Sequence, residues 1–153
     1  QGLFPLRSFL HEGPVIWNEC GMRFAWKVKV REKTGGLNFL VRLGDEEKLS
    51  WVSPGEYLTR YQEREIVTQP DLILQLAHHI GEEYAQKTGQ NVAVFADAKS
   101  SLNGRPTHPL IDPKQDLMKA EDGFLCPDWI LPPPETDPPR LTYNPAKRFE
   151  RRK

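Results

Sequence analysis

The sequence has few of the features that mark the common functional classes. Its 153 residues carry no net charge, with 21 basic and 21 acidic side chains, which argues against a protein dedicated to binding nucleic acid. No apolar run approaches the roughly 20 residues that a membrane-spanning helix needs. The sequence also has no phosphate-binding glycine loop, nucleophile elbow or dinucleotide-binding fingerprint. These absences exclude the commonest nucleotide-binding and hydrolase sites.

The composition fits one domain of ordinary size with a real core. Apolar residues make up 38% of the chain and charged residues 27%, so the chain is only modestly hydrophobic. The sequence begins with Gln1, in the middle of what looks like structured sequence. We therefore expect it to be an excised fragment of a longer protein.

Cysteine is scarce, with only Cys20 and Cys126. Two cysteines permit one disulfide, which would suit an oxidising compartment, and their spacing matches no zinc-binding pattern. The alternative is two unrelated thiols, and we favour this second interpretation.

Alternating apolar and polar residues predict several strands. Residues 23–31 alternate with period two, as a half-buried strand does, and residues 37–43 alternate again. The segment Thr34-Gly35-Gly36 between them predicts the turn of a β-hairpin. Residues 49–51 predict a third short strand, which ends before Pro54.

A long helix is predicted next, ending at Gly89. Thr68 and Asp71 form a possible capping pair around Pro70, which is tolerated in a first helical turn. A shorter helix over 55–66 precedes it. The long helix has one apolar face, made of Ile73, Leu76, Ala77, Ile80 and Tyr84.

The last predicted strand covers residues 92–97, and prolines dominate after Pro106, where regular structure is not expected. Together, these predicted elements indicate an α+β domain, with an antiparallel sheet of about four strands packed with one long helix and a proline-rich C-terminal arm. We expect residues 1–131 to form a single domain. We expect residues 132–153 to be a proline-rich and basic tail that is partly disordered.

Two kinds of candidate site stand out, one of them on the long helix. His78, His79, Glu82 and Glu83 are the best metal-ligand candidates, but neighbouring helical residues point about 100° apart, so one ion could not take all four. We favour a solvated helix face and expect no metal. His11 and His108 are isolated in sequence, and each is either a site residue or a surface residue.

The other candidates lie in two segments, 9–26 and 101–116. Phe24 and Trp26 are expected to be core residues of the first strand. Phe9, Leu10, Gly13 and Trp17 precede that strand in a loop-like stretch, where apolar side chains mark either a binding surface or packing against the body of the domain. In the second segment, Asn103 and Gly104 predict a turn, and Arg105 either pairs with Asp97 or Asp112 or grips a substrate carboxylate.

As spaced sets, these two segments resemble the vitamin K-dependent gamma-glutamyl carboxylase family. The first set is Phe9-Leu10, Gly13, Trp17, Phe24 and Trp26, and the second is Ser101, Asn103, Arg105, Asp112, Pro113 and Asp116. The turn at Pro54-Gly55, the helix from Asp71, and Trp129 before the proline run also look similar. The resemblance covers roughly residues 5–131, and the compactness of the chain is more similar to the bacterial members.

The resemblance implies the soluble, extramembrane domain of a membrane enzyme, on the lumenal or periplasmic side. Such enzymes use reduced vitamin K, whose oxygenated form removes a proton from a peptide glutamate before carbon dioxide adds. The lysine that activates the quinone would lie in the membrane-embedded part of the same polypeptide, so this chain is expected to hold no catalytic residue and to be inactive alone. Glutamate or peptide binding is carried over to Phe9, Leu10, Gly13, Trp17, Asn103, Arg105 and Asp112. The alternatives are a peptide-binding module and a purely structural cap.

Overall fold

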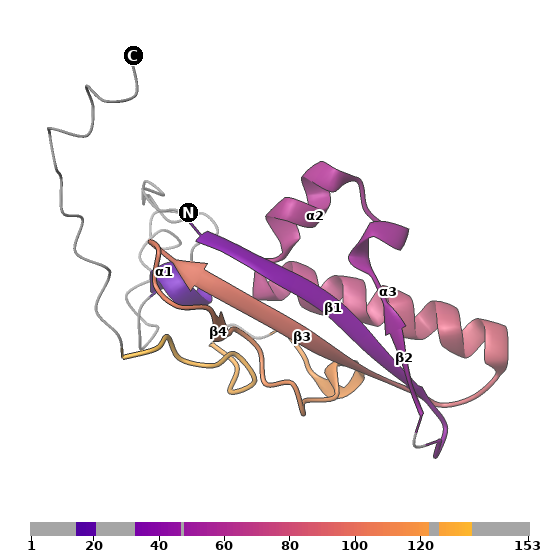
Figure 1. Ribbon diagram of the computed structural model, residues 1–153. Coiled ribbons are helices and arrows are strands. Elements are labelled where there is room, and N and C mark those ends of the chain that lie inside the picture. The colour runs from indigo at the N-terminus through magenta and orange to yellow at the C-terminus, as the bar shows by residue number, and fades with distance from the viewer. Residues whose placement is uncertain (1–14, 21–32, 47, 123–125, 136–153) are drawn as a thin grey trace, which may run out of the picture.

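The computed structural model describes residues 15–20, 33–46, 48–122 and 126–135. A four-stranded antiparallel sheet in the order β2-β1-β3-β4 forms its centre. Two long strands, β1 (Lys33–Leu43) and β3 (Val92–Leu102), pair along their whole length, and β2 (Leu49–Val52) and β4 (His108–Pro109) are short edges. The fold is the predicted α+β arrangement of a four-stranded antiparallel sheet with one long helix (Figure 1).

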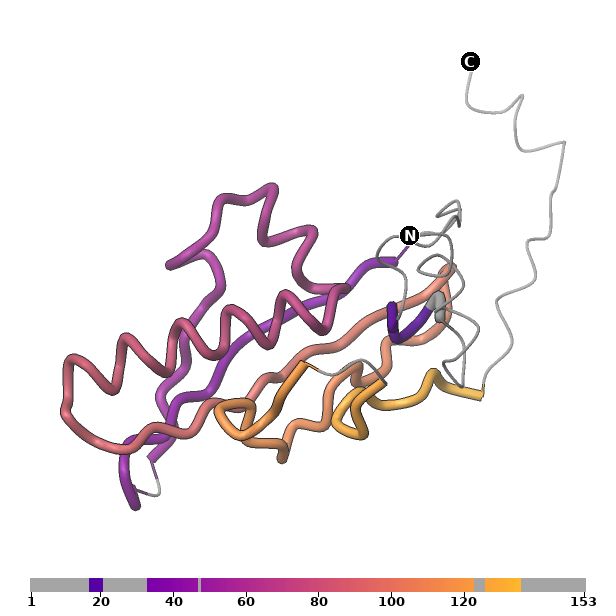
Figure 2. The backbone as a smooth tube through the Cα atoms, turned by 180° about the vertical axis from the view of Figure 1, so that it is seen from behind, coloured from indigo at the N-terminus to yellow at the C-terminus, as the bar shows by residue number. Residues whose placement is uncertain are grey.

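The long helix α3 (Pro70–Thr88) covers one face of the sheet (Figures 1 and 2). Its predicted apolar face is confirmed, because Ile73, Ala77 and Ile80 have no exposed surface. Gly89 ends the helix in the left-handed conformation at φ 68°, as predicted. The predicted capping pair is wrong: the N-cap is Gln69, without a side-chain cap, and Pro70 occupies the first turn.

Shorter elements complete the described part of the chain. α1 (Val15–Asn18) is a single helical turn in a stretch that we predicted to be loop-like. The predicted helix over 55–66 is divided into a 3-10 turn, η2 (Pro54–Glu56), and a helix, α2 (Arg60–Ile66). The two are separate because Thr59 starts a new helix as its N-cap, with Gln62 completing a capping box. A further 3-10 turn, η3 (Leu117–Lys119), packs beside α3 and β3.

The predicted turn at Thr34-Gly35-Gly36 is wrong, because β1 runs straight through it. Gly35 pairs with Ser100, and a Cβ atom at Gly35 would collide with the carbonyl oxygen of Lys99. Glycine is therefore needed in the strand for close backbone approach rather than for a turn. The actual hairpin joins β1 to β2 through Gly44, whose φ is 52°.

Several predictions lie outside the described residues. They are the strand over 23–31 with Phe24 and Trp26, the candidates Phe9, Leu10 and Gly13, and the tail beyond residue 135. Among the described residues, no helix has both the length and the apolar character needed to cross a membrane.

Candidate functional site

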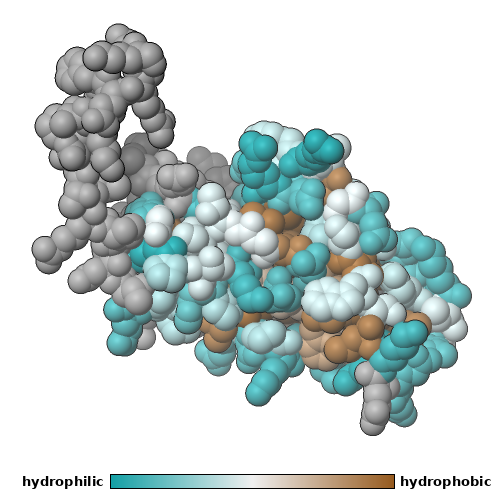
Figure 3. All heavy atoms as spheres, in the orientation of Figure 1, coloured by the Kyte–Doolittle hydropathy of each residue, from teal (hydrophilic) through white to brown (hydrophobic). Residues whose placement is uncertain are grey.

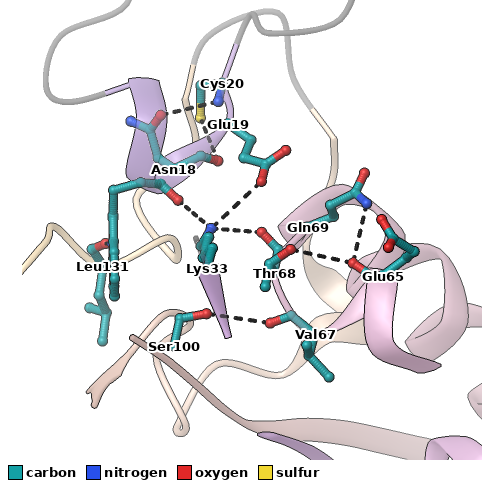
Figure 4. A network of polar contacts seen from close by, with 11 residues as sticks. Asn18, Glu19, Cys20, Lys33, Glu65, Val67, Thr68, Gln69, Ser100 and Leu131 are labelled. Atoms are coloured by element: carbon teal, nitrogen blue, oxygen red, sulfur yellow. Dashed lines mark hydrogen bonds and ion pairs between the residues drawn. The ribbon is translucent and has the colours of Figure 1, made fainter. Parts of the chain in front are cut away.

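The side chain of Lys33, the first residue of β1, is buried at the end of the sheet and is only 3% exposed. Its ammonium donates hydrogen bonds of 2.7 Å to the carbonyl oxygens of Trp17 and Thr68. It also lies 3.7 Å from the carboxylate of Glu19, itself 8% exposed, and 5.5 Å from the centre of the Trp17 ring. Figure 4 shows these contacts converging on Lys33 from α1 and from the α2–α3 connection. A buried charge needs such partners to be tolerated, so this lysine fixes α1 against the body of the domain.

Trp17 in α1 is the second anchor. Its side chain is 1% exposed, and its indole N–H donates a hydrogen bond of 2.8 Å to the carbonyl oxygen of Leu131. Leu131 is itself bound to Leu110 through a 3.0 Å backbone hydrogen bond. The start of the proline-rich arm is thereby held against α1. The described residues show Trp17 as a packed side chain, and its role in substrate binding stays a prediction.

Cys20 and Cys126 form a disulfide with their Cα atoms 5.4 Å apart, so the favoured interpretation of two unrelated thiols is wrong. Sequence spacing gave no sign of the pair because the two residues are 106 positions apart. Near Cys20, the side chain of Asn18 accepts a hydrogen bond of 3.1 Å from the Cys20 backbone N–H. We call Trp17, Cys20, Lys33, Cys126 and Leu131 the latch, because together they join the first described segment to the last.

The second candidate segment starts where β3 ends. Asn103 and Gly104 both have positive φ, 53° and 74°, which confirms the predicted turn. The backbone N–H of Arg105 closes it with a 3.2 Å hydrogen bond to Leu102, and the Ser101 hydroxyl donates to the Arg105 carbonyl at 2.6 Å. Asn103 is exposed and Arg105 is half-buried, so both reach the surface at this end of the sheet.

Asp112 and Asp116 use their carboxylates for the backbone. Asp112 accepts a hydrogen bond of 2.9 Å from the Lys114 N–H, as an aspartate that starts a turn does. Asp116 accepts from Met118 at 3.1 Å, which caps η3, and from Val94 at 3.2 Å on the outer edge of β3. These two aspartates therefore shape the loop after β4. The carboxylate of Asp97 lies 2.9 Å from the Lys99 ammonium, and the pairing of Arg105 with Asp97 or Asp112 stays a prediction.

The structure brings the two candidate segments together at one point. The rings of Trp17 and His108 lie 6.2 Å apart at an angle of 54°, so α1 and β4 are neighbours. His108 was predicted to be either a site or a surface residue, and it is half-buried beside the latch. Of the predicted site residues that the structure describes, Trp17 and the 101–112 segment share this end of the sheet.

His78, His79 and Glu83 of α3 make contacts with different partners. His78 donates through Nε2 to the Leu117 carbonyl oxygen at 2.8 Å, whereas His79 packs edge-on against the Tyr57 ring. Hydrogen bonds from Lys87 and then Tyr57 lower the pKa of the Glu83 carboxyl, and burial together with the Glu83 contact raises the pKa of Tyr57 well above its ordinary value. Among the described residues, no group of three or more such side chains converges on one metal position.

Sequence reasoning missed Lys33, Glu19 and Leu131. Lys33 looked like an ordinary charged residue before a turn, and Leu131 takes part through a backbone carbonyl, which no side-chain pattern reveals. The sequence feature that could have indicated this contact between the two ends was the pair of cysteines, one in the first described segment and one in the last.

The comparisons with known proteins identify the family. A family model described as the vitamin K-dependent gamma-carboxylase, lumenal domain, matches residues 1–136. No curated protein and no solved structure matches the chain. Because the match covers most of the 153 residues, the chain belongs to the vitamin K-dependent gamma-carboxylase lumenal domain family.

Proposed function

We propose that this chain is the extracytoplasmic domain of a membrane enzyme that carboxylates glutamate, and that it helps to bind the glutamate-containing substrate. The observation that carries this proposal is the family match over residues 1–136. The disulfide between Cys20 and Cys126 supports the placement, because disulfides persist in oxidising compartments such as the lumen or the periplasm.

The latch supports a role in substrate binding. It fixes α1, which directly follows Phe9, Leu10 and Gly13 in the chain, and it places Trp17 beside His108 in the second candidate segment. Residues that must present a substrate in one orientation need such rigid support. Apolar side chains before α1 would shield a carbanion from water, which suits carbon dioxide addition.

Reduced vitamin K is the cofactor that the family implies. Two hollows among the described residues, one beside β2 and one between α2 and α3, are wide and open to solvent, whereas a cofactor site encloses most of its ligand. Neither of these two hollows fits a quinone site. We therefore propose that the quinone and the lysine that activates it belong to a membrane-embedded part of the same polypeptide.

The test uses the full-length gene product in membranes, supplied with reduced vitamin K, oxygen, labelled bicarbonate and a glutamate peptide. Quinone epoxide and fixed label are measured together. We expect both products, loss of label with Leu10→Arg, and no epoxide from this chain alone. Epoxide without label would contradict glutamate as the substrate, and the absence of both products would refute the enzyme assignment.

A structural cap is the second candidate, and the burial of Trp17 favours it for that residue. Peptide binding by the purified chain separates the two. If Leu10→Arg and Arg105→Ala both leave the affinity for an acidic peptide unchanged, the domain does not bind substrate through these segments.

A further inference from the structure

The face of the sheet opposite α3 has no covering layer among the described residues (Figures 1 and 2). The registers place Trp51, Leu40 and Phe95 in one row across β2, β1 and β3, and Leu49 and Arg42 in the next row. Residues directly opposite each other in antiparallel strands lie on the same face. Trp51 is 65% exposed and Leu49 43%, and Figure 3 shows separate hydrophobic patches among polar surface on this side of the molecule. We call these five residues the open face.

The open face has both a protrusion and a recess. The exposed indole of Trp51 stands beside a hollow of about 620 Å³, whose lining includes Leu40, Leu49, Phe95 and Pro113. Exposed apolar side chains that adjoin one another, with polar residues around them, are typical of protein interaction sites. Tryptophan and arginine are also the residue types enriched at the energetic centres of protein interfaces.

Charges of both signs flank the same hollow. Arg42 lines it from β1 and Lys114 from the loop after β4, and Asp45 and Glu46 line it from the β1–β2 turn. The Arg42 guanidinium lies 5.5 Å from the centre of the Phe95 ring, which holds it within the face. A surface with two cations and two acids does not favour an anionic lipid or an acidic peptide. Because each copy presents both signs, two copies related by a two-fold rotation would be able to pair the cations of one with the acids of the other.

We propose that the open face is the interface between two copies of this chain. In a two-fold pair, Trp51 of each copy enters the hollow of the other, and the cations of each copy meet the acids of the other. The pairing is isologous, so each contact occurs twice. This inference is independent of the proposed catalytic role.

Charge reversal tests the arrangement. The oxidised chain is studied by sedimentation equilibrium as wild type, Arg42→Glu, Glu46→Arg and an equimolar mixture of the two variants. We expect a wild-type dimer and a dimer dissociation constant at least tenfold weaker for each variant alone, because like charges then face each other. The mixture should dimerise again. In the mixed pair, one contact joins the two substituted side chains with their charges exchanged, and the other contact keeps the native Arg42 and Glu46.

Trp51→Ser should also give a monomer, whereas Tyr61→Ser, which removes another exposed aromatic from α2, should leave the dimer intact. Circular dichroism confirms that each variant is folded. A wild type that stays monomeric at several hundred micromolar would overturn the proposal, as would a mixture that fails to dimerise. Trp51-dependent binding of a monomer to phosphatidylserine vesicles would instead assign the face to a lipid surface.

Discussion

The indole N–H of Trp17 and the carbonyl oxygen of Leu131 are joined by a 2.8 Å hydrogen bond across 114 positions of sequence. Trp129 lies two residues before Leu131 and is also buried, yet its Nε1 atom finds no acceptor in the described part of the chain. The two buried indole N–H groups therefore differ in having an acceptor, so substitutions at the two sites compare a bonded with an unbonded indole N–H.

Trp17→Phe and Trp129→Phe remove the same atoms from two buried sites. Trp17→Phe also breaks the hydrogen bond to Leu131, so we expect it to lower the free energy of unfolding by about 1 kcal/mol more than Trp129→Phe does. Urea unfolding of both variants gives this difference. Equal losses would mean that the Leu131 contact contributes nothing.

Lys33→Met leaves Glu19 without its buried cation and two carbonyl oxygens without a donor. We expect a loss of about 3–5 kcal/mol in the free energy of unfolding. The matched control is Lys99→Met, because Lys99 pairs with Asp97 on the surface and its side chain is 53% exposed. An exposed pair contributes only about 0–1 kcal/mol, so similar losses for the two variants would contradict the buried role of Lys33.

The adjacent glycines of β1 provide a sharp steric test. Gly35→Ala drives a methyl group into the backbone of Lys99 and should destabilise the domain by roughly 1–3 kcal/mol. Gly36→Ala meets nothing within 4 Å and should be neutral or slightly stabilising. Thermal unfolding of the two variants distinguishes a strand from a turn at this position, because alanine would be tolerated alike at both glycines of an open turn.

Reduction of the disulfide releases a loop closed by residues 106 apart. The loop-closure entropy then returned to the unfolded chain predicts a loss on the order of 4–5 kcal/mol. Denaturation with and without a reducing agent measures it, with the Cys20→Ser/Cys126→Ser double variant as a control that should be insensitive to reductant. An unchanged midpoint on reduction would contradict the prediction.

We expect Glu83 to make the free energy of unfolding depend on pH, with a sign that follows from the direction of its pKa shift. Its carboxyl pKa is lowered in the folded state, mainly by Lys87 and then by Tyr57, so its contribution to stability is present above about pH 4.5 and is lost as the pH falls through the lower folded value. Glu83→Gln should therefore flatten the decline of stability at acid pH, whereas Glu82→Gln, on the exposed side of the same turn, should not. Urea midpoints between pH 3 and pH 6 provide the comparison. A parallel decline in both variants would rule Glu83 out as the source.

Local sequence pattern was enough to predict the parts of the fold that depend on local rules. The 3.6-residue spacing of Ile73, Ala77 and Ile80 predicted α3, and alternation predicted the strands around Val41 and Val94. The Gly35-Gly36 pair led to the wrong prediction of a turn, because glycine occurs both in tight turns and where two strands approach each other closely. Only the strand opposite Gly35 distinguishes the two.

The candidate site was predicted less completely, since its contacts are distant in sequence. The segments around Trp17 and Asn103 were selected by resemblance, but nothing in their composition showed that Trp17 would meet His108 or that Lys33 would bind two carbonyl oxygens. Backbone acceptors such as that of Leu131 carry no residue-type signal, so this kind of contact is invisible until the chain is folded.

The latch also sets an order of events during synthesis. Cys20 leaves the ribosome 106 residues before Cys126, and at typical elongation rates this interval lasts about 5–20 s. In that time β1, α3 and β3 are all available to pair, while Trp17 and Lys33 still lack part of their surroundings. The disulfide cannot form until Cys126 emerges, and before then the Cys20 thiol could react with a thiol oxidant or bind a chaperone.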